Sequence, residues 1–298
     1  MSDKDNYVIF NPEGGLGKII ASTAVVRNIK ATYPDHKIIV ITPWPEVFLN
    51  NPNVERVYRS GNTPYFYKDY IKDRQSIVLK GEPYFNTNHL YNKQQLAKSW
   101  CELHNLKYDG NNVPELFFTP LELRKVREDI IRDKPILIMQ TNGGMYSDKS
   151  KKYCWTRDIP FTQAQILANE LSKNFAILHV ARTGCNTLAN TETINEVDKR
   201  TLMLLLTVSQ KRLLIDSCLQ HAAAALNLSS TVLWVGTHPQ VFGYDIHDNI
   251  MSRDALENNT SYIDSLFFDY DFNGPEYEYP YDSDDIFNLQ DVYNSVVK

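Results

Sequence analysis

Residues 7–42 read YVIFNPEGGLGKIIASTAVVRNIKATYPDHKIIVIT, and the fold of the chain can be worked out from this stretch. Its two ends, YVIF and KIIVIT, are short runs rich in β-branched residues, which are typical of buried strands. Between them, three closely spaced glycines precede a long segment that we expect to be a helix from about Gly17. A strand, a glycine loop, a helix and a second strand in this order predict a parallel sheet with crossover helices.

The same alternation of strands and helices continues along the chain. Further strand-like runs are VERVYR (54–59), SIVLK (76–80), PILIMQ (135–140), FAILHV (175–180), LLIDS (213–217) and TVLWVG (231–236). Helices are expected over 119–134, 162–173, 200–209 and 218–226. We therefore predict an α/β fold of two doubly wound, Rossmann-like halves, residues 1–130 and 131–298, which face a central cleft where ligands of such folds bind.

Composition and charge limit the class of protein. The 298 residues, 43% of them hydrophobic, suffice for one large or two ordinary domains. A formal net charge of -5 argues against the broad basic field that usually drives binding to nucleic acid. The four cysteines lie far apart without a CxxC pair, so we expect free thiols in a reducing cytoplasm and neither a zinc site nor disulfides. A polar, acidic start and the lack of an apolar run approaching ~18 residues predict a cytoplasmic protein without stable membrane insertion.

The tail from about residue 261 is acidic and rich in aromatic residues: it reads SYIDSLFFDYDFNGPEYEYPYDSDDIFNLQDVYNSVVK. Acidity favours disorder, whereas Phe and Tyr side chains favour burial, so a partly ordered extension and an organised segment are equally open. We expect the final portion of this tail (261–298) to pack back on the body of the protein, against the N-terminal domain.

Phosphate binding is one of two interpretations of the glycine loop. A P-loop needs a glycine five positions before its Gly-Lys pair and Ser or Thr after it, but Pro12 and Ile19 occupy those places. A dinucleotide fingerprint fits Gly15 and Gly17 but has Ile20 where its third glycine belongs. The glycines still permit positive φ ahead of helix-start N–H groups that favour an anion. A strand-to-helix turn without any ligand is equally open.

Polar residues gather at two strand ends in LLIDSCLQHAAAALNLSSTVLWVGTHP, residues 213–239. Asp216 and Ser217 end one strand and open a helix, which they can cap without any ligand. His221 follows Ser217 by four residues, so the two lie on the same side of that helix. A helical histidine is more often packed or solvated, but the direction shared with Asp216 leaves a binding role equally open. Thr237 lies at the end of the next strand.

A long loop, QTNGGMYSDKSKKYCWTRDIPFTQ (140–163), follows the first strand of the second half. It carries three lysines and Arg157 within a short distance along the chain. A charge run is usually a solvated face, and this is the default interpretation for Lys149 and Lys151. Lysine side chains and the start of the next helix can instead neutralise a diphosphate that lies across this strand.

Together these segments resemble glycosyltransferase family 9, the heptosyltransferase-like enzymes of the GT-B superfamily. The N-terminal match is GGLGKIIASTAVVRNIKATYPDHKIIVIT followed by NPNVERVY, and the C-terminal match is IDSCLQHAAAALNLSSTVLWVGTHP. The order and separation of the motifs agree over about residues 7–245. The resemblance implies transfer of a hexose, heptose or pentose from a nucleotide diphosphate sugar to an acceptor hydroxyl. It also implies inversion at the anomeric carbon, no metal ion, and no cofactor besides this co-substrate.

The resemblance also implies roles for individual residues. Asp216 and His221 fall on donor-binding positions, with Asp216 on the sugar hydroxyls, and Ser217 offers its hydroxyl and its helix-start N–H. Lys152, three residues before Trp155, best fits the position of the lysine that meets the donor phosphate, and Lys151 fits it nearly as well. The implied sites are completed by Thr141 and Thr237 on the donor side, and by Gly14, Gly15 and Gly17 of the glycine loop on the acceptor side.

Lys18 departs from the family pattern, because an aspartate that is expected to be the general base usually occupies this position. A protonated lysine cannot take a proton from a hydroxyl. Glu13, on the same loop, is therefore our candidate for the base, and a solvated loop carboxylate is the equally open alternative. Lys18 is then expected to contact phosphate or an acidic acceptor, a role that lysine fulfils while charged.

Two alternatives to a saccharide transferase stay open. Lys18 in place of the aspartate also fits a non-catalytic nucleotide-sugar binding protein. The other alternative is a phage-type transferase that glycosylates a hydroxylated DNA base, with the basic residues of 149–157 on the DNA backbone. The expected partners are thus a nucleotide sugar donor and an unidentified acceptor: a saccharide, a lipid-linked glycan or a modified DNA.

Overall fold

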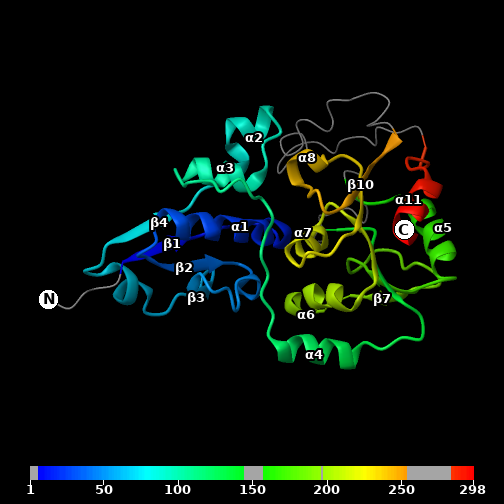
Figure 1. Cartoon of the computed structure of the whole chain (residues 1–298), viewed down its shortest axis with the longest axis horizontal. Helices are drawn as coiled ribbons and strands as arrows, with labels where there is room; N and C mark the ends of the chain where they lie inside the picture. The colour runs from blue at the N-terminus through cyan, green and yellow to red at the C-terminus, as the bar shows by residue number, and fades with distance from the viewer. Residues whose placement is uncertain (1–5, 144–156, 196, 254–282) are drawn as a thin grey trace. The chain divides into compact units, whose positions relative to one another are not determined.

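The computed structural model describes residues 6–143, 157–195, 197–253 and 283–298. Contacts along the chain divide it into two compact units, Met1–Thr119 and Pro120–Lys298, each with its own sheet (Figure 1). The helix expected over 119–134 is α4 (Pro120–Asp129), and its contacts place it in the second unit. Both units have an α/β fold with a parallel sheet, as the sequence predicted.

The first unit is built on a four-stranded parallel sheet. Its strands are β1 (Tyr7–Phe10), β2 (Lys37–Thr42), β3 (Val54–Arg59) and β4 (Ser76–Leu79), in the order β3-β2-β1-β4. Phe10, the last residue of β1, is in register with Leu79, the last residue of β4. The loops that follow these two strands therefore emerge next to each other at one edge of the sheet.

Helices cover one face of the first sheet. α1 (Leu16–Thr32) is buried along most of its length, and α3 (Leu96–Leu103) packs beside it. Trp100 of α3 meets Phe10 of β1 edge to face, with ring centroids 6.4 Å apart. The short elements of this unit are η1 (Pro45–Val47), η2 (Tyr67–Ile71), η3 (Pro83–Phe85) and α2 (Thr87–Tyr91). On the opposite face, Tyr70 of the single turn η2 packs on the side chains of β1, β2 and β3.

The second unit contains a six-stranded parallel sheet. Its strands are β5 (Ile136–Gln140), β6 (Ala176–Val180), β7 (Glu192–Ile194), β8 (Lys211–Ile215), β9 (Thr231–Trp234) and β10 (Asp248–Met251), in the order β10-β9-β8-β5-β6-β7. β5 pairs with β6 on one side and with β8 on the other, so the strand order reverses there. Ligands of such open sheets bind outside the carboxyl ends of the strands at this switch point.

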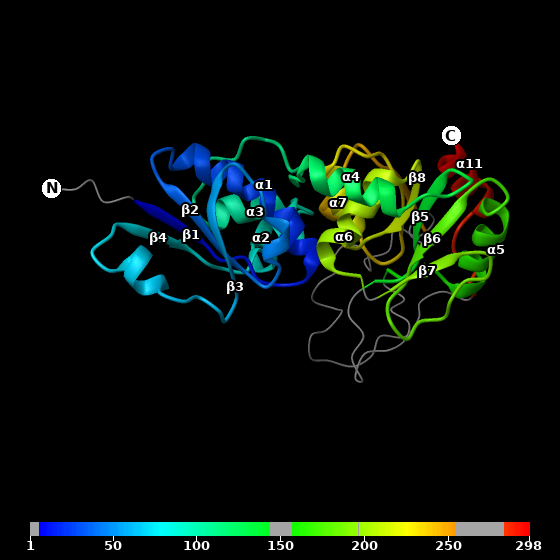
Figure 2. The ribbon, with the colours of Figure 1, turned by 90° about the horizontal axis from the view of Figure 1, so that it is seen from below.

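Helices cover both faces of the second sheet. Figure 2 shows α4, α6 and α7 on one side of the strands and α5 and α11 on the other. After α4, the described residues of this unit form the helices α5 (Phe161–Leu171), α6 (Lys199–Leu204), α7 (Cys218–Ala225), α8 (Pro239–Phe242) and α11 (Leu289–Val297), with the 3-10 turn η4 (Leu205–Val208). This is the doubly wound arrangement predicted for the C-terminal half.

The end of the acidic tail forms α11 and belongs to the second unit. Val292 and Val296 of this helix are buried in the same core as Leu213 of β8 and Leu233 of β9. The expectation that the tail packs against the N-terminal domain is therefore wrong for residues 283–298. The physical reason is that the apolar stripe of α11 covers the part of the second sheet that α5 leaves open. Residues 261–282 of the tail lie outside the described residues.

Candidate functional site

The carboxyl ends of β5 and β8 meet at the switch point of the second sheet. Gln140, the last residue of β5, donates a hydrogen bond from Nε2 to Ser217 Oγ at 3.2 Å. The backbone after β5 also passes close to this serine, since a Cβ on Gly143 would lie 3.0 Å from Ser217 Oγ. Ser217 is the N-cap residue of α7, but its side chain makes no capping hydrogen bond. Its hydroxyl thus faces the switch point rather than the helix backbone.

Asp216 lies directly before this serine and is buried, with 7% of its surface exposed. Burial raises the pKa of its carboxyl group, and the Arg157 guanidinium opposes the rise. The side chains of Thr237 and Gln220 face the same carboxylate and also act to lower its pKa. Two predicted residues from different strand ends, Asp216 and Thr237, are therefore brought together here beside a basic residue.

His221 lies one turn into α7, and its ring is enclosed by the protein. Its Nδ1 shares a hydrogen bond of 2.8 Å with the Tyr244 hydroxyl, and the two rings meet edge to face at 5.6 Å. Burial lowers the pKa of His221 to about 3, with smaller contributions from His247 and Arg157. The imidazole is therefore neutral at pH 7 and adds no positive charge, and its Nε2 lies 3.2 Å from Gln220 Nε2.

Thr141 extends the site along β5. Its Oγ1 shares a hydrogen bond of 2.8 Å with Nε2 of the buried His179 on β6. Burial lowers the pKa of His179 to about 4, so this histidine is also neutral. Four of the predicted donor residues of the second unit lie just beyond the carboxyl ends of neighbouring strands: Thr141, Asp216, Ser217 and Thr237. The fifth, His221, lies inside α7, where it contacts Tyr244.

A buried ion pair frames the start of the long loop after β5. Arg182 Nη2 lies 3.7 Å from Asp158 Oδ2, and both side chains are almost fully buried. The peptide of Gly143 is held by both residues: its N–H donates to Asp158 Oδ1 at 3.1 Å, and its carbonyl accepts from Arg182 Nη1 at 2.9 Å. This pair was not predicted from the sequence. Its only signal was the position of Arg182 just after a predicted strand.

Lys152, the lysine predicted to meet the donor phosphate, lies outside the described residues, as do Lys149 and Lys151. Arg157 is the basic residue of this loop that the structure describes, and it lies near Asp216 and His221.

The glycine loop of the first unit brings the backbone close to Lys18. Gly14 has φ +123°, and a Cβ at this position would lie 2.8 Å from Lys18 Cδ. The Gly14 carbonyl accepts a hydrogen bond from Trp44 Nε1 at 3.1 Å. Gly15 is the N-cap residue of α1, and Gly17 lies in the first turn of that helix. The helix start is thus shaped around one lysine side chain.

Lys18 itself points into the protein, where its charge is balanced. Its Nζ donates to both oxygens of Glu82, at 2.6 and 2.5 Å, and only 7% of the lysine side chain is exposed. The ammonium group also lies 4.4 Å from the ring centroid of Tyr84 and 5.7 Å from that of Trp100. Burial lowers the pKa of Lys18, and Glu82 opposes this effect. Glu82 follows β4, and its role beside Lys18 was not predicted from the sequence.

Glu13, the predicted general base, lies on the surface of the same loop. Its carboxylate is 3.0 Å from Lys80 Nζ, and the two side chains are 58% and 59% exposed. An ion pair this exposed constrains the carboxylate only weakly.

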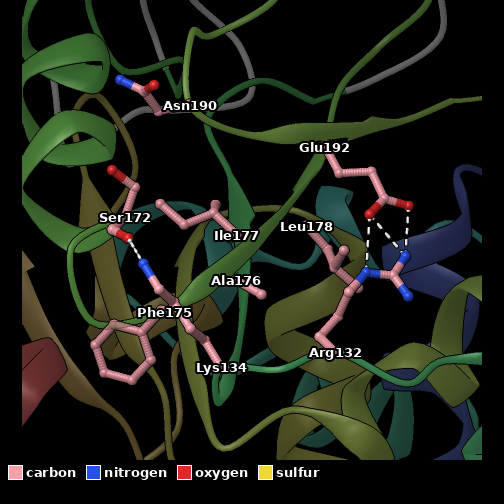
Figure 3. A pocket seen from close by; sticks show the side chains of 9 residues that line it. All are labelled: Arg132, Lys134, Ser172, Phe175, Ala176, Ile177, Leu178, Asn190 and Glu192. Atoms are coloured by element: carbon pink, nitrogen blue, oxygen red, sulfur yellow. Dashed lines mark hydrogen bonds and ion pairs between the residues drawn. The ribbon is translucent and has the colours of Figure 1, made fainter.

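Hollows of the second unit lie at the other end of its sheet. One of about 390 Å³ is lined by residues near the start of β6 and around β7 (Figure 3). The basic side chains that line this hollow already have partners. Arg132 donates bidentate hydrogen bonds to Glu192, and Lys134 Nζ donates to the Ser172 carbonyl at 2.8 Å. None of the predicted site residues lines it.

Within the described ranges, no cluster of three or more His, Cys, Asp or Glu side chains is arranged to hold a metal ion. No helix found in the same residues has the length and apolar character needed to cross a membrane.

Comparisons with known proteins agree with this fold. No protein-family model and no curated protein matches the sequence. The structure is similar to that of the Escherichia coli ADP-heptose LPS heptosyltransferase II, with 14% identity over 83% of this chain and 89% of that chain and a TM-score of 0.63. A glycosyl transferase family 9 structure from Veillonella parvula matches with 11% identity over 82% and 86% of the two chains, with a TM-score of 0.58.

The E. coli heptosyltransferase WaaC, solved with ADP, matches with 12% identity over 83% of this chain and 93% of that chain, with a TM-score of 0.52. The chain therefore shares the fold of heptosyltransferases and of a family 9 glycosyltransferase. The resemblance predicted from the motifs is confirmed at the level of the fold.

Proposed function

We propose that the protein is a glycosyltransferase that moves a sugar from a nucleotide diphosphate sugar to an acceptor hydroxyl. The observation that carries the proposal is the convergence of Asp216, Ser217 and Gln140 at the switch point of the second sheet, with Arg157 near Asp216. This convergence occurs in a chain that shares the fold of heptosyltransferases, one of them solved with ADP. The two units are proposed to work in a GT-B arrangement, with the donor held by the second unit and the acceptor offered by the first.

The chemistry of the second unit suits a nucleotide diphosphate sugar. Asp216 accepts hydrogen bonds from sugar hydroxyls, while the neutral His221 and Ser217 supply further polar contacts. The first N–H groups of α7, which Ser217 leaves uncapped, attract the diphosphate. Arg157 and Lys152 supply positive charge to the leaving group, so the transfer needs neither a metal ion nor a cofactor. Inversion at the anomeric carbon is the proposed stereochemical outcome.

Ligand binding by the second unit tests the donor site. The full chain is titrated with ADP-heptose, UDP-glucose and GDP-mannose, and affinity is measured by calorimetry. Asp216→Asn should weaken binding of the bound sugar by about tenfold or more, because a charged hydrogen-bond acceptor is lost. Asp245→Asn, a change to an exposed carboxylate of the same unit, is the matched control and should leave the affinity unchanged. Binding of none of the three donors, or equal binding by Asp216→Asn, would contradict the proposed site.

A non-catalytic nucleotide-sugar binding protein is the second candidate. The observation in its favour is that Lys18, at the position expected to hold the base, is tied to Glu82 inside the first unit. The transferase and the binding protein are distinguished by measuring release of nucleotide diphosphate. The acceptors added are simple saccharides, a lipid-linked glycan or hydroxymethylated DNA. Donor binding without release in any acceptor mixture would favour the binding protein, and release with one acceptor class identifies the substrate.

A further inference from the structure

The partly exposed carboxylate of Glu82 lies beside Lys18, next to the glycine loop. The local sequence of this loop shows the lysine but not its carboxylate partner. The Lys18 side chain extends from the first turn of α1 and contacts the Glu82 side chain, which extends from the loop after β4. The register of β1 with β4 brings the two loops together. The lysine side chain is 7% exposed and the glutamate side chain 36%, so the carboxylate is the member of the pair that solutes can reach.

The Glu82 side chain is held from two sides. It is the N-cap residue of η3, and its Oε1 accepts a hydrogen bond from the Tyr84 backbone N–H at 3.2 Å. Lys18 Nζ donates to both carboxylate oxygens. Among the described residues, Oε2 therefore accepts from Lys18 alone. A carboxylate oxygen has two lone pairs, so Oε2 keeps one acceptor position for a substrate hydroxyl.

The other charged groups of this loop are less suited to accept a proton. Lys18 is enclosed by Glu82, Tyr84 and Trp100, and while protonated it has no lone pair to offer. Glu13 has a carboxylate, but its side chain is 58% exposed and forms an ion pair with the similarly exposed Lys80. A general base acts best when its position is fixed within hydrogen-bond reach of the proton that it removes. Glu82 meets this condition better than Glu13 does.

We propose that Glu82, through Oε2, is the general base of sugar transfer and that Lys18 holds it in position. The inference rests on the transferase function proposed above. In the step, the acceptor O–H proton passes to Glu82 as the acceptor oxygen forms a bond to the anomeric carbon of the donor. The bond from that carbon to the diphosphate oxygen breaks, and its electrons leave with the nucleotide diphosphate.

The assignment of Glu82 as the base is tested by measuring kcat of matched variants. The assay uses the donor and the acceptor with which the unaltered protein shows transfer. Glu82→Gln should lower kcat by about 10²–10⁴-fold, the usual range for loss of a general base, while the Kd of the donor stays within about threefold. Glu46→Gln is the matched control, because Glu46 is also an ion-paired carboxylate of the first unit and its side chain is 27% exposed. Its kcat should equal that of the unaltered protein.

Removal of Glu82 alone leaves the buried Lys18 charge without its partner, and the variant can lose stability for that reason. The double variant Lys18→Met/Glu82→Gln removes both charges and should fold with a Tm near that of the unaltered protein, yet remain inactive. Glu82→Ala provides a readout that a structural role would not move. Added formate, a carboxylate small enough to enter the space left by the side chain, should restore part of its turnover.

The outcomes separate the two proposals. Loss of kcat in both glutamine variants of Glu82, with donor binding intact and formate rescue, supports the base. Retained turnover in the folded double variant would overturn the inference while leaving the transferase function in place. Loss of kcat in Glu13→Gln with retention in Glu82→Gln would assign the base to Glu13. No transfer by the unaltered protein to any acceptor would remove the proposed function, and this inference with it.

Discussion

At the scale of single residues, Gly14 determines where the Lys18 side chain can go. The Lys18 side chain lies close to the glycine loop where it reaches Glu82, and a Cβ on Gly14 would lie 2.8 Å from its Cδ. A positive φ of +123° at this glycine carries the chain across the lysine. A side chain at position 14 would therefore compete with the lysine for this space, whatever the loop binds.

Gly14→Ala should destabilise the first unit by about 1–3 kcal/mol, because the new methyl group meets Lys18 and the backbone is held where L side chains are strained. Urea unfolding of the full chain measures the change. Gly15→Ala is the matched control: its Cβ would meet no atom within 4 Å, and φ is -70°. The control should lose less than about 1 kcal/mol. Equal losses in the two variants would show that the contact with Lys18 does not matter.

The residue types and their order along the chain identified the residues of each local motif. They did not identify the residues from distant parts of the chain that contact them. Asp216, Ser217 and His221 lie within six residues, so a pattern at one strand end could reveal them. Glu82 is separated from Lys18 by 64 residues, and the two meet only because β4 pairs with β1. Strand order is a nonlocal property, and the alternation of strands and helices does not specify it. Tyr244 and Arg182 were missed for the same reason.

At the scale of elements, most strands could be predicted from sequence, whereas the short outer strands β7 and β10 and the place of the last helix could not. The runs at 54–59 and 76–80 are β3 and β4, because short β-branched runs between turns have few alternatives in an α/β chain. The tail was harder, since its acidity and its aromatic residues give opposite expectations. Its final helix shows an apolar stripe of Val292 and Val296, but nothing local indicates which sheet that stripe covers.

Val292→Ala tests the contribution of α11 to the second core. The side chain is fully buried among β8, β9 and α5, so its truncation should lower the free energy of unfolding by about 1–3 kcal/mol. Val297→Ala, in the same helix with 38% of the residue exposed, should change it by less than about 0.5 kcal/mol. Chemical denaturation of both variants gives the comparison. Similar values for the two would mean that α11 does not share the core.

At the scale of the whole molecule, the second unit carries three buried neutral histidines around its site. Burial lowers the pKa of His179 to about 4, that of His221 to about 3 and that of His247 to about 4, from an ordinary value of 6.5. Below pH 6.5, these three histidines therefore bind fewer protons in the folded state than in the unfolded chain. Their contribution to stability is complete above that pH and is lost as the pH falls toward these lowered values.

We expect the Tm of the second unit to fall between pH 7 and pH 5, a range in which exposed carboxylates change their charge little. Each histidine adds up to about 1.4 kcal/mol per pH unit to the slope below pH 6.5. Scanning calorimetry at both pH values measures the dependence. His179→Gln removes one of the three groups and should flatten the slope by about one third. A Tm that is the same at pH 7 and pH 5 would show that these histidines are protonated in the folded protein.

The position of α11 in the second core also bears on how the protein forms on the ribosome. The first unit has its whole sheet and its covering helices once residue 119 has left the exit tunnel, and it can fold while synthesis continues. The second sheet cannot close its core until residues 289–297 have been translated. At a translation rate of about 5–20 residues per second, its apolar strands stay without their last covering helix for many seconds. Nascent-chain chaperones should therefore engage the second half of the polypeptide and not the first.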